Sequence, residues 1–182
     1  MIIRKTEIEG LLEIEPSVIE DPRGYFLESF RRDRLREAGI GAEFVQDNES
    51  MSKKGVLRGL HFQAPPYEQG KLVRVVKGAV LDVALDIRVN SPTFGRHCSI
   101  LLSEANKKQF WVPPGFAHGF LVLEDDTIFS YKCTGYYNRE SEGSVRWNDP
   151  ALNIDWNISD PILSEKDKIA PLLSQLDSPF RL

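Results

Sequence analysis

The sequence predicts an all-β domain with two short peripheral helices. Short runs of alternating apolar and polar residues recur along most of the chain, separated by Gly- and Pro-rich stretches, a pattern typical of antiparallel sheets. Helical periodicity is confined to two segments. Because no repeat, low-complexity tract or linker interrupts the 182 residues, we expect one domain whose strands form a sandwich or barrel.

The clearest strands lie at 71–88, KLVRVVKGAVLDVALDIR. Two β-branched runs flank Lys77 and Gly78, which predict a tight hairpin turn because glycine adopts positive φ without steric cost. Apolar and charged side chains alternate in the second run, as in a strand with two different faces. Further strands are expected at 44–50, 56–63, 97–103, 108–112, 118–124 and 127–134, between proline- and glycine-rich turns.

Two stretches carry helical signals. The segment 31–39, RRDRLREAG, is short and charged and ends at Gly39, a residue typical of helix C-termini. The segment 163–176 begins with Ser164, whose hydroxyl is suited to cap the first turn. Both helices are expected at the edge of the β domain.

The composition narrows the classes of partner. The net charge is −4, so the chain has no global basic field for a nucleic-acid polymer, although a local Arg/Lys cluster can still bind a small phosphorylated ligand. Cys98 and Cys133 are too few for a disulfide framework. No apolar run approaches the length of a membrane span, and the first residues alternate apolar and charged types. We therefore expect no membrane partner and a cytoplasmic location.

One strand contains polar residues that are costly to bury. In VLRGLHFQAP, His61 and Arg58 stand among aliphatic and aromatic residues, where an unpaired charge would be strongly disfavoured. Strict alternation would send these two side chains to opposite faces of the strand. If both serve one site, a bulge at Gly59 must redirect one of them, because glycine within a strand often marks a bulge.

The histidine spacing does not favour a metal centre. His118 also lies in an apolar strand beside glycine, whereas His97 follows a turn and is expected to be structural. The chain has no His-x-His pair, and His61 and His118 are 57 positions apart with no cluster of ligands beside either. We expect no metal ligands, and metal-free acid–base chemistry is favoured.

Other polar residues have ordinary structural explanations when each is taken alone. A tyrosine in a strand is usually a core residue, a lysine at a strand end is usually solvated, and an acidic residue three positions after Ser164 fits a capping turn. These residues are Arg23, Glu28, Gln46, Asn48, Lys71, Tyr131 and Asp167.

Their joint arrangement is more specific. The segments DPRGYFLESF, FVQDNESMSKKGVLRGLHFQ, GKLVRVVKGAVLDVALDIRVNSPTFG, FWVPPGFAHGFLVLEDDTIFSYKCTGYYNRESEGSVRWNDP and ILSEKD resemble the dTDP-4-dehydrorhamnose 3,5-epimerases, in order, over about residues 1–170. The resemblance implies one RmlC-like cupin domain over 1–182, a double-stranded β-helix with the C-terminal helices packed on the barrel. It also implies a homodimer that exchanges N-terminal segments.

The resemblance further implies a reaction without a metal or organic cofactor. The substrate would be the nucleotide sugar dTDP-4-dehydro-6-deoxy-D-glucose, epimerised at C3 and C5 to dTDP-4-dehydro-L-rhamnose. This product leads to dTDP-L-rhamnose, a precursor of lipopolysaccharide or cell-wall polysaccharide.

The residues that match the family's motifs would take the following roles. His61 would be the general base, Asp167 its carboxylate partner, Tyr131 the proton donor, and Lys71 the cation near the ketone. The remaining matches are substrate contacts. They comprise Arg23, Phe26 and Glu28 from the exchanged segment, Gln46, Asn48, Arg58, His118 and Glu142, Tyr137 stacked on thymine, and Lys166 near the phosphates.

These residue types suit proton exchange beside a ketone. Removal of the proton gives an enolate, so the reaction needs a base and a donor for the oxyanion. A neutral histidine can accept the proton, and a carboxylate such as Asp167 would fix its tautomer. Burial would lower the pKa of Lys71 at the ketone. Inversion requires His61 and Tyr131 to approach the sugar from opposite faces.

Three alternatives remain open at this point. A 3-epimerase of a related dTDP-sugar would use the same base but invert one centre. A nucleotide-sugar binding module would need neither base nor acid. A metal-dependent cupin oxygenase or isomerase would need ligands that the histidine spacing does not suggest.

Overall fold

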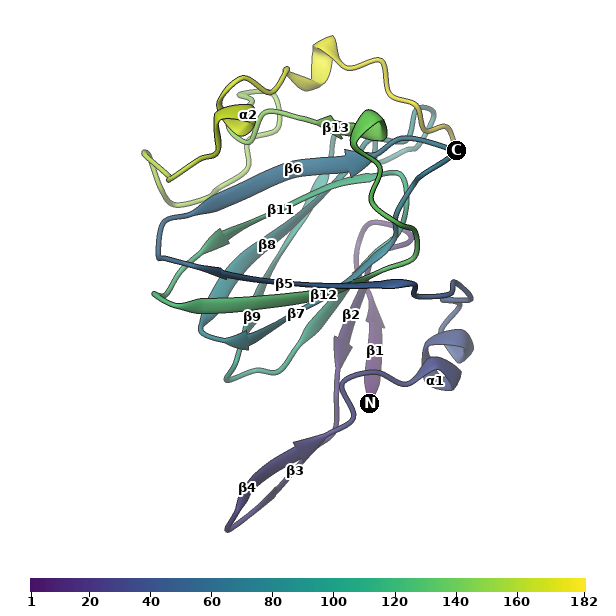
Figure 1. The fold of residues 1–182 in the computed structure, drawn as a ribbon. Coiled ribbons are helices and arrows are strands. Elements are labelled where there is room, and N and C mark those ends of the chain that lie inside the picture. Colours follow the sequence, from purple (N-terminus) through teal and green to yellow (C-terminus); the bar gives the residue numbers. More distant parts are fainter.

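The computed structural model describes residues 1–182 as two antiparallel sheets that face each other, with a hairpin projecting away from them (Figure 1). The six-stranded sheet has the order β1 (Ile2–Lys5), β2 (Leu12–Glu15), β10 (Gln109–Val112), β7 (Lys71–Lys77), β12 (Thr127–Cys133) and β5 (Gln46–Ser52). The five-stranded sheet has the order β13 (Glu142–Ser144), β6 (Leu57–Gln63), β11 (Phe116–Val122), β8 (Ala79–Asp86) and β9 (His97–Ser103). The all-β prediction is confirmed.

The turn expected within 71–88 is present, but the predicted hairpin is wrong. β7 pairs with β10 and β12, whereas β8 pairs with β9 and β11, so the turn links the two sheets. β7 ends at Lys77 and β8 begins at Ala79, so the connection is the single residue Gly78. This residue has φ +80°, and a Cβ atom there would lie 2.3 Å from Thr127 Oγ1. Glycine is therefore required both for the backbone conformation and for the contact with β12.

Apolar side chains fill part of the space between the sheets and also cover both outer faces. The interior cluster draws on β7, β8, β10, β11 and β12, with Phe110 and Phe129 fully buried at its centre. The second cluster packs the 145–182 segment against the five-stranded sheet, and the third packs α1 (Arg32–Glu37) and the loop after it against the six-stranded sheet. Both sheets are thus covered outside as well as inside.

The first predicted helix is confirmed and the second is largely wrong. α1 is followed by Gly39 at φ +91°, in agreement with the expected helix end. In 163–176 only α2 (Glu165–Lys168) and the 3₁₀ turn η2 (Leu173–Gln175) are helical. Pro171 explains the break, because it lacks an N–H and disfavours helical geometry in the residue before it. Ser164 caps α2 as expected.

Several short elements had no clear signal in the sequence. β1, β2, β3 (Val18–Asp21), β4 (Gly24–Leu27) and β13 are strands of three or four residues, and η1 (Arg139–Ser141) is a single 3₁₀ turn. Runs of this length contain too few residues for alternation to be recognised. The two α-helices lack the length and apolar character needed to cross a bilayer.

The predicted bulge at Gly59 is confirmed. His61 pairs with His118 and Arg58 pairs with Phe120, so two residues of β6 lie opposite the single residue Gly119 of β11. The two strands approach closely at this point. A Cβ atom on Gly59 would lie 2.5 Å from Gly119 Cα, and one on Gly119 would lie 2.7 Å from Arg58 O. The bulge therefore depends on a pair of glycines.

We predict that Gly119→Ala destabilises the protein by about 1–3 kcal/mol, because the new methyl group would overlap the backbone of β6. Thermal unfolding should show this as a decrease of several degrees in Tm. Gly41→Ala is the matched control, since Gly41 has a negative φ and open space at the Cβ position, and its Tm should change little. An unchanged Tm for Gly119→Ala would contradict this account of the bulge.

Candidate active site

A cavity of about 680 Å³ lies in the interior between the two sheets and is closed on one side by the 162–167 segment. Its size is within the usual range for small-molecule sites. Most of the residues predicted for the site line it. They are Gln46, Asn48, Arg58, His61, Lys71, His118, Tyr131, Tyr137, Glu142, Lys166 and Asp167.

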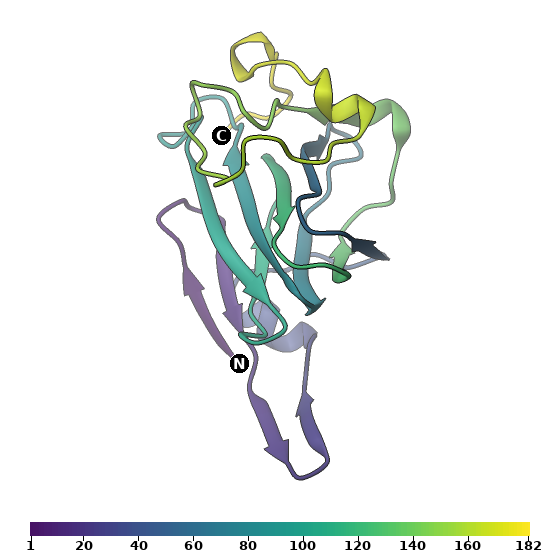
Figure 2. The ribbon, with the colours of Figure 1, turned by 90° about the vertical axis from the view of Figure 1, so that its left-hand side faces the viewer.

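Three predicted residues lie elsewhere in the chain. Arg23 and Phe26 belong to the β3–β4 hairpin, and Glu28 follows directly after it. The hairpin extends away from both sheets in Figures 1 and 2. Within one chain, therefore, these residues are not brought to the cavity.

His61 and Asp167 are in direct polar contact in the cavity wall. His61 projects from β6, and Asp167 lies in α2, 106 positions later in the chain. The distance between His61 Nε2 and Asp167 Oδ1 is 2.5 Å, and the Asp167 side chain is only 2% exposed. The short helix α2, fixed by its Ser164 cap, thus presents a buried carboxylate to the imidazole.

The charge of Asp167 is maintained despite its burial. Burial by itself would raise the pKa of this carboxyl, but the hydrogen bond and charge of His61, with smaller contributions from Ser164 and Lys166, outweigh it and lower the pKa. An ionised Asp167 accepts a hydrogen bond from Nε2–H. The lone pair of the ring is then on Nδ1, as a general base requires.

Lys71 starts β7 and lies in the interior. Burial lowers the pKa of its ammonium group, in the direction expected from the sequence, while Cys133, Asp82 and Glu142 oppose the shift by charge. A desolvated ammonium group of this kind interacts strongly with any negative charge that develops on a ligand, because little water screens it.

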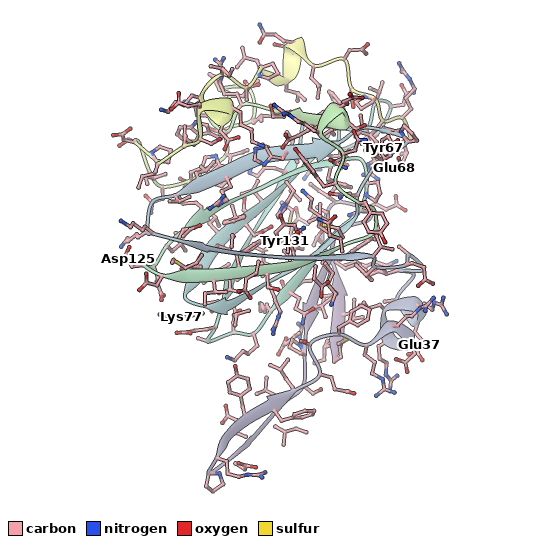
Figure 3. All side chains as sticks on the ribbon, viewed as in Figure 1. Glu37, Tyr67, Glu68, Lys77, Asp125 and Tyr131 are labelled. Atoms are coloured by element: carbon pink, nitrogen blue, oxygen red, sulfur yellow. The ribbon has the colours of Figure 1, made fainter.

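Tyr131 is on β12, in the sheet opposite His61, and lies between the two sheets in Figure 3. Burial is the main cause that raises the pKa of its phenol, and Cys133 adds to the effect, whereas Arg58 and a hydrogen bond with Asn48 act against it. The phenol is therefore protonated at neutral pH and can donate. A donor and a base thus belong to opposing walls of one cavity.

A second His–Asp pair lies deeper in the same wall. His118 Nε2 is 2.8 Å from Asp82 Oδ1, and both residues are buried. The His118 ring also stacks on Phe129 at 6.3 Å between ring centres. Asp82 had no role predicted from the sequence. It stands as a single acidic residue in the apolar stretch AVLDVAL, and nothing in that stretch indicates His118 as its partner.

The open end of the cavity carries a chain of polar contacts. The Tyr137 hydroxyl donates to Glu142 Oε2 at 3.3 Å, and Lys166 Nζ forms an ion pair with Glu142 Oε1. Burial would raise the pKa of Glu142, but the bonds from Lys166 and Tyr137 and the charges of Lys166 and His61 lower it. Arg58 is held from another side by Ser52, whose Oγ accepts from Nη2 at 3.1 Å.

Gln63 and Gln69 also line the cavity and were missed by the sequence analysis. Their amides bond to backbone groups of the loop after β12, so the sequence signal for them is weak. Nowhere do three or more His, Cys, Asp or Glu side chains gather into a group that could hold a metal ion.

Two antiparallel sheets around a polar cavity are the architecture of cupin-type β-barrels, and a base and a proton donor on opposing walls suit an isomerase. The chain belongs to the dTDP-4-dehydrorhamnose 3,5-epimerase family, whose sequence profile matches residues 5–175. The predicted family and the predicted cupin fold are therefore confirmed.

Individual relatives and solved structures are similar to this chain over most of its length. A dTDP-4-dehydrorhamnose 3,5-epimerase of Shigella flexneri is 53% identical over 168 residues, which is 92% of this chain and 93% of that protein. The crystal structure of a Legionella pneumophila 3,5-epimerase in complex with dTDP-4-keto-L-rhamnose superimposes with a TM-score of 0.95, at 51% identity over 100% of this chain and 98% of that one. A 3′-monoepimerase of Streptomyces bikiniensis, in complex with dTDP-quinovose, has a TM-score of 0.88 at 37% identity over 93% and 86% of the chains.

We predict that Asp167→Asn lowers kcat roughly 10²- to 10⁴-fold with little change in KM. The amide can donate to Nε2 of His61, which would move the ring proton to Nδ1 and remove the basic lone pair. Steady-state kinetics of the purified variant with the dTDP-sugar would measure the effect.

The same variant has a second readout in its acid stability. Since the folded-state pKa of Asp167 is lowered, its charge stabilises the fold above the unfolded pKa of about 3.9 and loses that effect as pH falls through the folded value. The free energy of unfolding should therefore fall less steeply below about pH 4 in Asp167→Asn than in the native protein. If the variant and the native protein have the same kcat and the same loss of unfolding free energy below about pH 4, the role given to this pair is wrong.

Proposed function

We propose that this protein is a dTDP-4-dehydrorhamnose 3,5-epimerase. It acts in the cytoplasm and converts dTDP-4-dehydro-6-deoxy-D-glucose to dTDP-4-dehydro-L-rhamnose, the precursor of dTDP-L-rhamnose. The observation that carries the proposal is the His61–Asp167 pair in a cavity whose opposite wall holds Tyr131. The family membership and the 53% identity to a 3,5-epimerase support the choice of substrate.

In the proposed reaction His61 removes the proton from the carbon beside the C4 ketone. The electron pair of the C–H bond moves into the ring to form an enolate, and the negative charge on its oxygen is stabilised by Lys71. The new imidazolium is stabilised by Asp167 at 2.5 Å. A single preorganised donor such as Lys71 is typically worth roughly 3–4 kcal/mol in the transition state.

Inversion follows when the proton returns from the other face. Tyr131 donates its phenolic proton to the enolate carbon at C5, and the oxyanion reverts to a ketone. A phenol with a raised pKa retains its proton until an anionic carbon is present, which favours the ordered sequence of abstraction and donation. The same base and donor serve C3 and C5 in turn, after His61 has released its proton to solvent and Tyr131 has regained one from it.

The nucleotide end of the substrate is expected at the open side of the cavity. Arg58 and Lys166 supply positive charge for the diphosphate, and Arg geometry suits phosphate oxygens. Tyr137 is 54% exposed, and its aromatic ring can stack on thymine. Gln46, Asn48, His118 and Glu142 complete the polar lining.

Deuterium incorporation provides the direct test. Incubation of the purified protein with dTDP-4-dehydro-6-deoxy-D-glucose in deuterated water should give a product labelled at both C3 and C5, because each inversion takes a proton that has exchanged with solvent. Mass spectrometry and NMR would count the labelled positions. Label at C3 alone would indicate a monoepimerase, and no label at either carbon would rule out the proposed function.

We predict that Tyr131→Phe impairs inversion at C5 more than it impairs proton exchange. The variant retains His61 and Lys71, so enolate formation continues, while the donor on the second face is absent. The exchange rate and the yield of L-configured product, measured in one NMR time course, should diverge by at least about tenfold, the lower part of the usual range for a positioned acid. An equal loss of both would make Tyr131 a structural residue.

We also propose that the protein is a homodimer whose β3–β4 hairpins exchange. An isolated two-stranded hairpin is marginal in water, and this one exposes Ile19 by 63% and Phe26 by 64%. Burial of these residues on a second copy would remove that cost. It would also bring Arg23, Phe26 and Glu28 to the partner's cavity, where the resemblance expects them.

We predict that Ile19→Asp weakens this dimer by at least about tenfold, because it would bury a charge in an apolar contact. Sedimentation or light scattering across a dilution series would measure the dimer fraction, and specific activity should fall in parallel. Leu101→Ser, which changes an exposed apolar residue of β9, is the control and should leave both unchanged. A native protein that is monomeric at all concentrations would contradict the exchange.

A further inference from the structure

The segment 134–138, TGYYN, connects β12 to η1 and crosses from one sheet to the other (Figure 1). It contains no helix or strand, and Tyr136 and Tyr137 are 69% and 54% exposed. Nevertheless its backbone is bonded along its whole length. The first residue, Thr134, donates its N–H to Gly70 O at 3.0 Å and accepts from Gly70 N through Oγ1 at 2.8 Å.

Three glutamine side chains from separate parts of the chain bond the rest of the segment. Gln69, just before β7, donates from Nε2 to Gly135 O at 2.7 Å. Gln46, the first residue of β5, accepts from Tyr137 N through Oε1 at 3.1 Å. We call the set of Gln46, Gln63 and Gln69 the amide clamp.

Gln63 is its central member and makes three hydrogen bonds. Its Nε2 donates to Tyr136 O at 3.3 Å and to Tyr67 O at 3.0 Å, and its Oε1 accepts from Asn138 N at 3.0 Å. Tyr67 lies just beyond the end of β6 in Figure 3. The Gln63 side chain is therefore enclosed by two loops, and the residue is only 5% exposed.

The chemistry of these bonds explains why the residue is an amide. Gln63 uses its donor and its acceptor at the same time, which neither a carboxylate nor an aliphatic side chain can do. A methionine at this position would leave the backbone groups that Gln63 satisfies without partners. Buried polar groups without partners are costly, so the 134–138 segment would move to find water.

We infer that Gln63 and Gln69 are positioning residues that hold the ring of Tyr137 in the nucleotide-binding wall of the cavity. The ring is held at its other end as well, because its hydroxyl donates to Glu142, the residue that pairs with Gln63 across β6 and β13. The backbone is thus fixed by amides and the phenol by a carboxylate. This inference rests on the proposed function, in which the Tyr137 ring stacks on thymine.

The hydrogen bonds of Gln63 contact the nucleotide-binding wall and not the acid–base groups. Gln63 is two positions after His61 on β6, yet its bonds lead outward to the 134–138 segment and none leads to Asp167, Lys71 or Tyr131. Loss of the Gln63 bonds should therefore disorder the stacking surface and leave the acid–base groups in place. A change in KM without a change in kcat is the signature of such a residue.

The test compares Gln63→Met and Gln69→Met with the native protein. Methionine retains the length of the side chain and adds no charge. Calorimetric titration with dTDP should show about tenfold weaker binding for Gln63→Met, within the range that stacking on one base provides, and a smaller loss for Gln69→Met. KM for the dTDP-sugar should rise in proportion, while kcat stays within about twofold.

A double-mutant cycle distinguishes the clamp from a direct ligand contact or a general loss of stability. If Gln63 acts through the Tyr137 ring, Gln63→Met should change the dTDP Kd by less than about twofold in a Tyr137→Ala background. An undiminished effect in that background would overturn the inference. Gln175→Met removes an amide that accepts from Leu172 N in the C-terminal segment, and this matched control should bind dTDP as the native protein does.

The variant at Gln69 keeps the test informative if Gln63→Met does not fold, because Gln69 is half-buried and makes one bond. Native dTDP affinity in a folded Gln69→Met would then overturn the inference. Failure of the proposed function gives a different result, since the native protein would incorporate no deuterium whatever its affinity for dTDP.

Discussion

The close approach of Gly59 and Gly119 is the constraint on which the cavity wall depends. Neither position has room for a Cβ atom, and the bulge between them shifts the register of β6 against β11. Side chains alternate along a strand, so the extra residue is what allows Arg58 and His61 to line one cavity. Gln63 follows His61 by two positions and lines the same cavity. One local irregularity therefore orients three cavity-lining side chains, those of Arg58, His61 and Gln63.

Burial acts on the titratable groups of this cavity in opposite directions. It lowers the pKa of Lys71 and raises that of Tyr131, because in each case it disfavours the charged form. Asp167 and Glu142 differ, since hydrogen bonds and nearby positive charges outweigh their desolvation and lower both pKa values. The ordinary pKa values of lysine and tyrosine differ by less than about one unit. Burial thus makes the Tyr131 phenol hold its proton more firmly, and the Lys71 ammonium less firmly, than each would in water.

The sequence predicted those elements whose signals lie within a few neighbouring residues. The 71–88 strands and their glycine turn were evident from alternation and from one dipeptide. The helix expected at 163–176 was wrong, because the effect of Pro171 outweighed favourable capping. The site residues were predicted from the resemblance, and most of them line the cavity. The pairing of Asp82 with His118 and the bonds of the amide clamp could not be predicted, because they depend on register between strands far apart in the sequence.

The position of α2 near the C-terminus determines when the His61–Asp167 pair can form during synthesis. Asp167 comes 106 positions after His61, and every strand of both sheets precedes it in the chain. Domains emerge from the ribosome N-terminus first, so the barrel is translated before the carboxylate that orients its base. A nascent chain that has reached residue 160 contains the sequence of all eleven strands of the two sheets but lacks Asp167, the hydrogen-bond partner of His61. The His61–Asp167 pair can therefore form only after the segment that contains α2 has been synthesised.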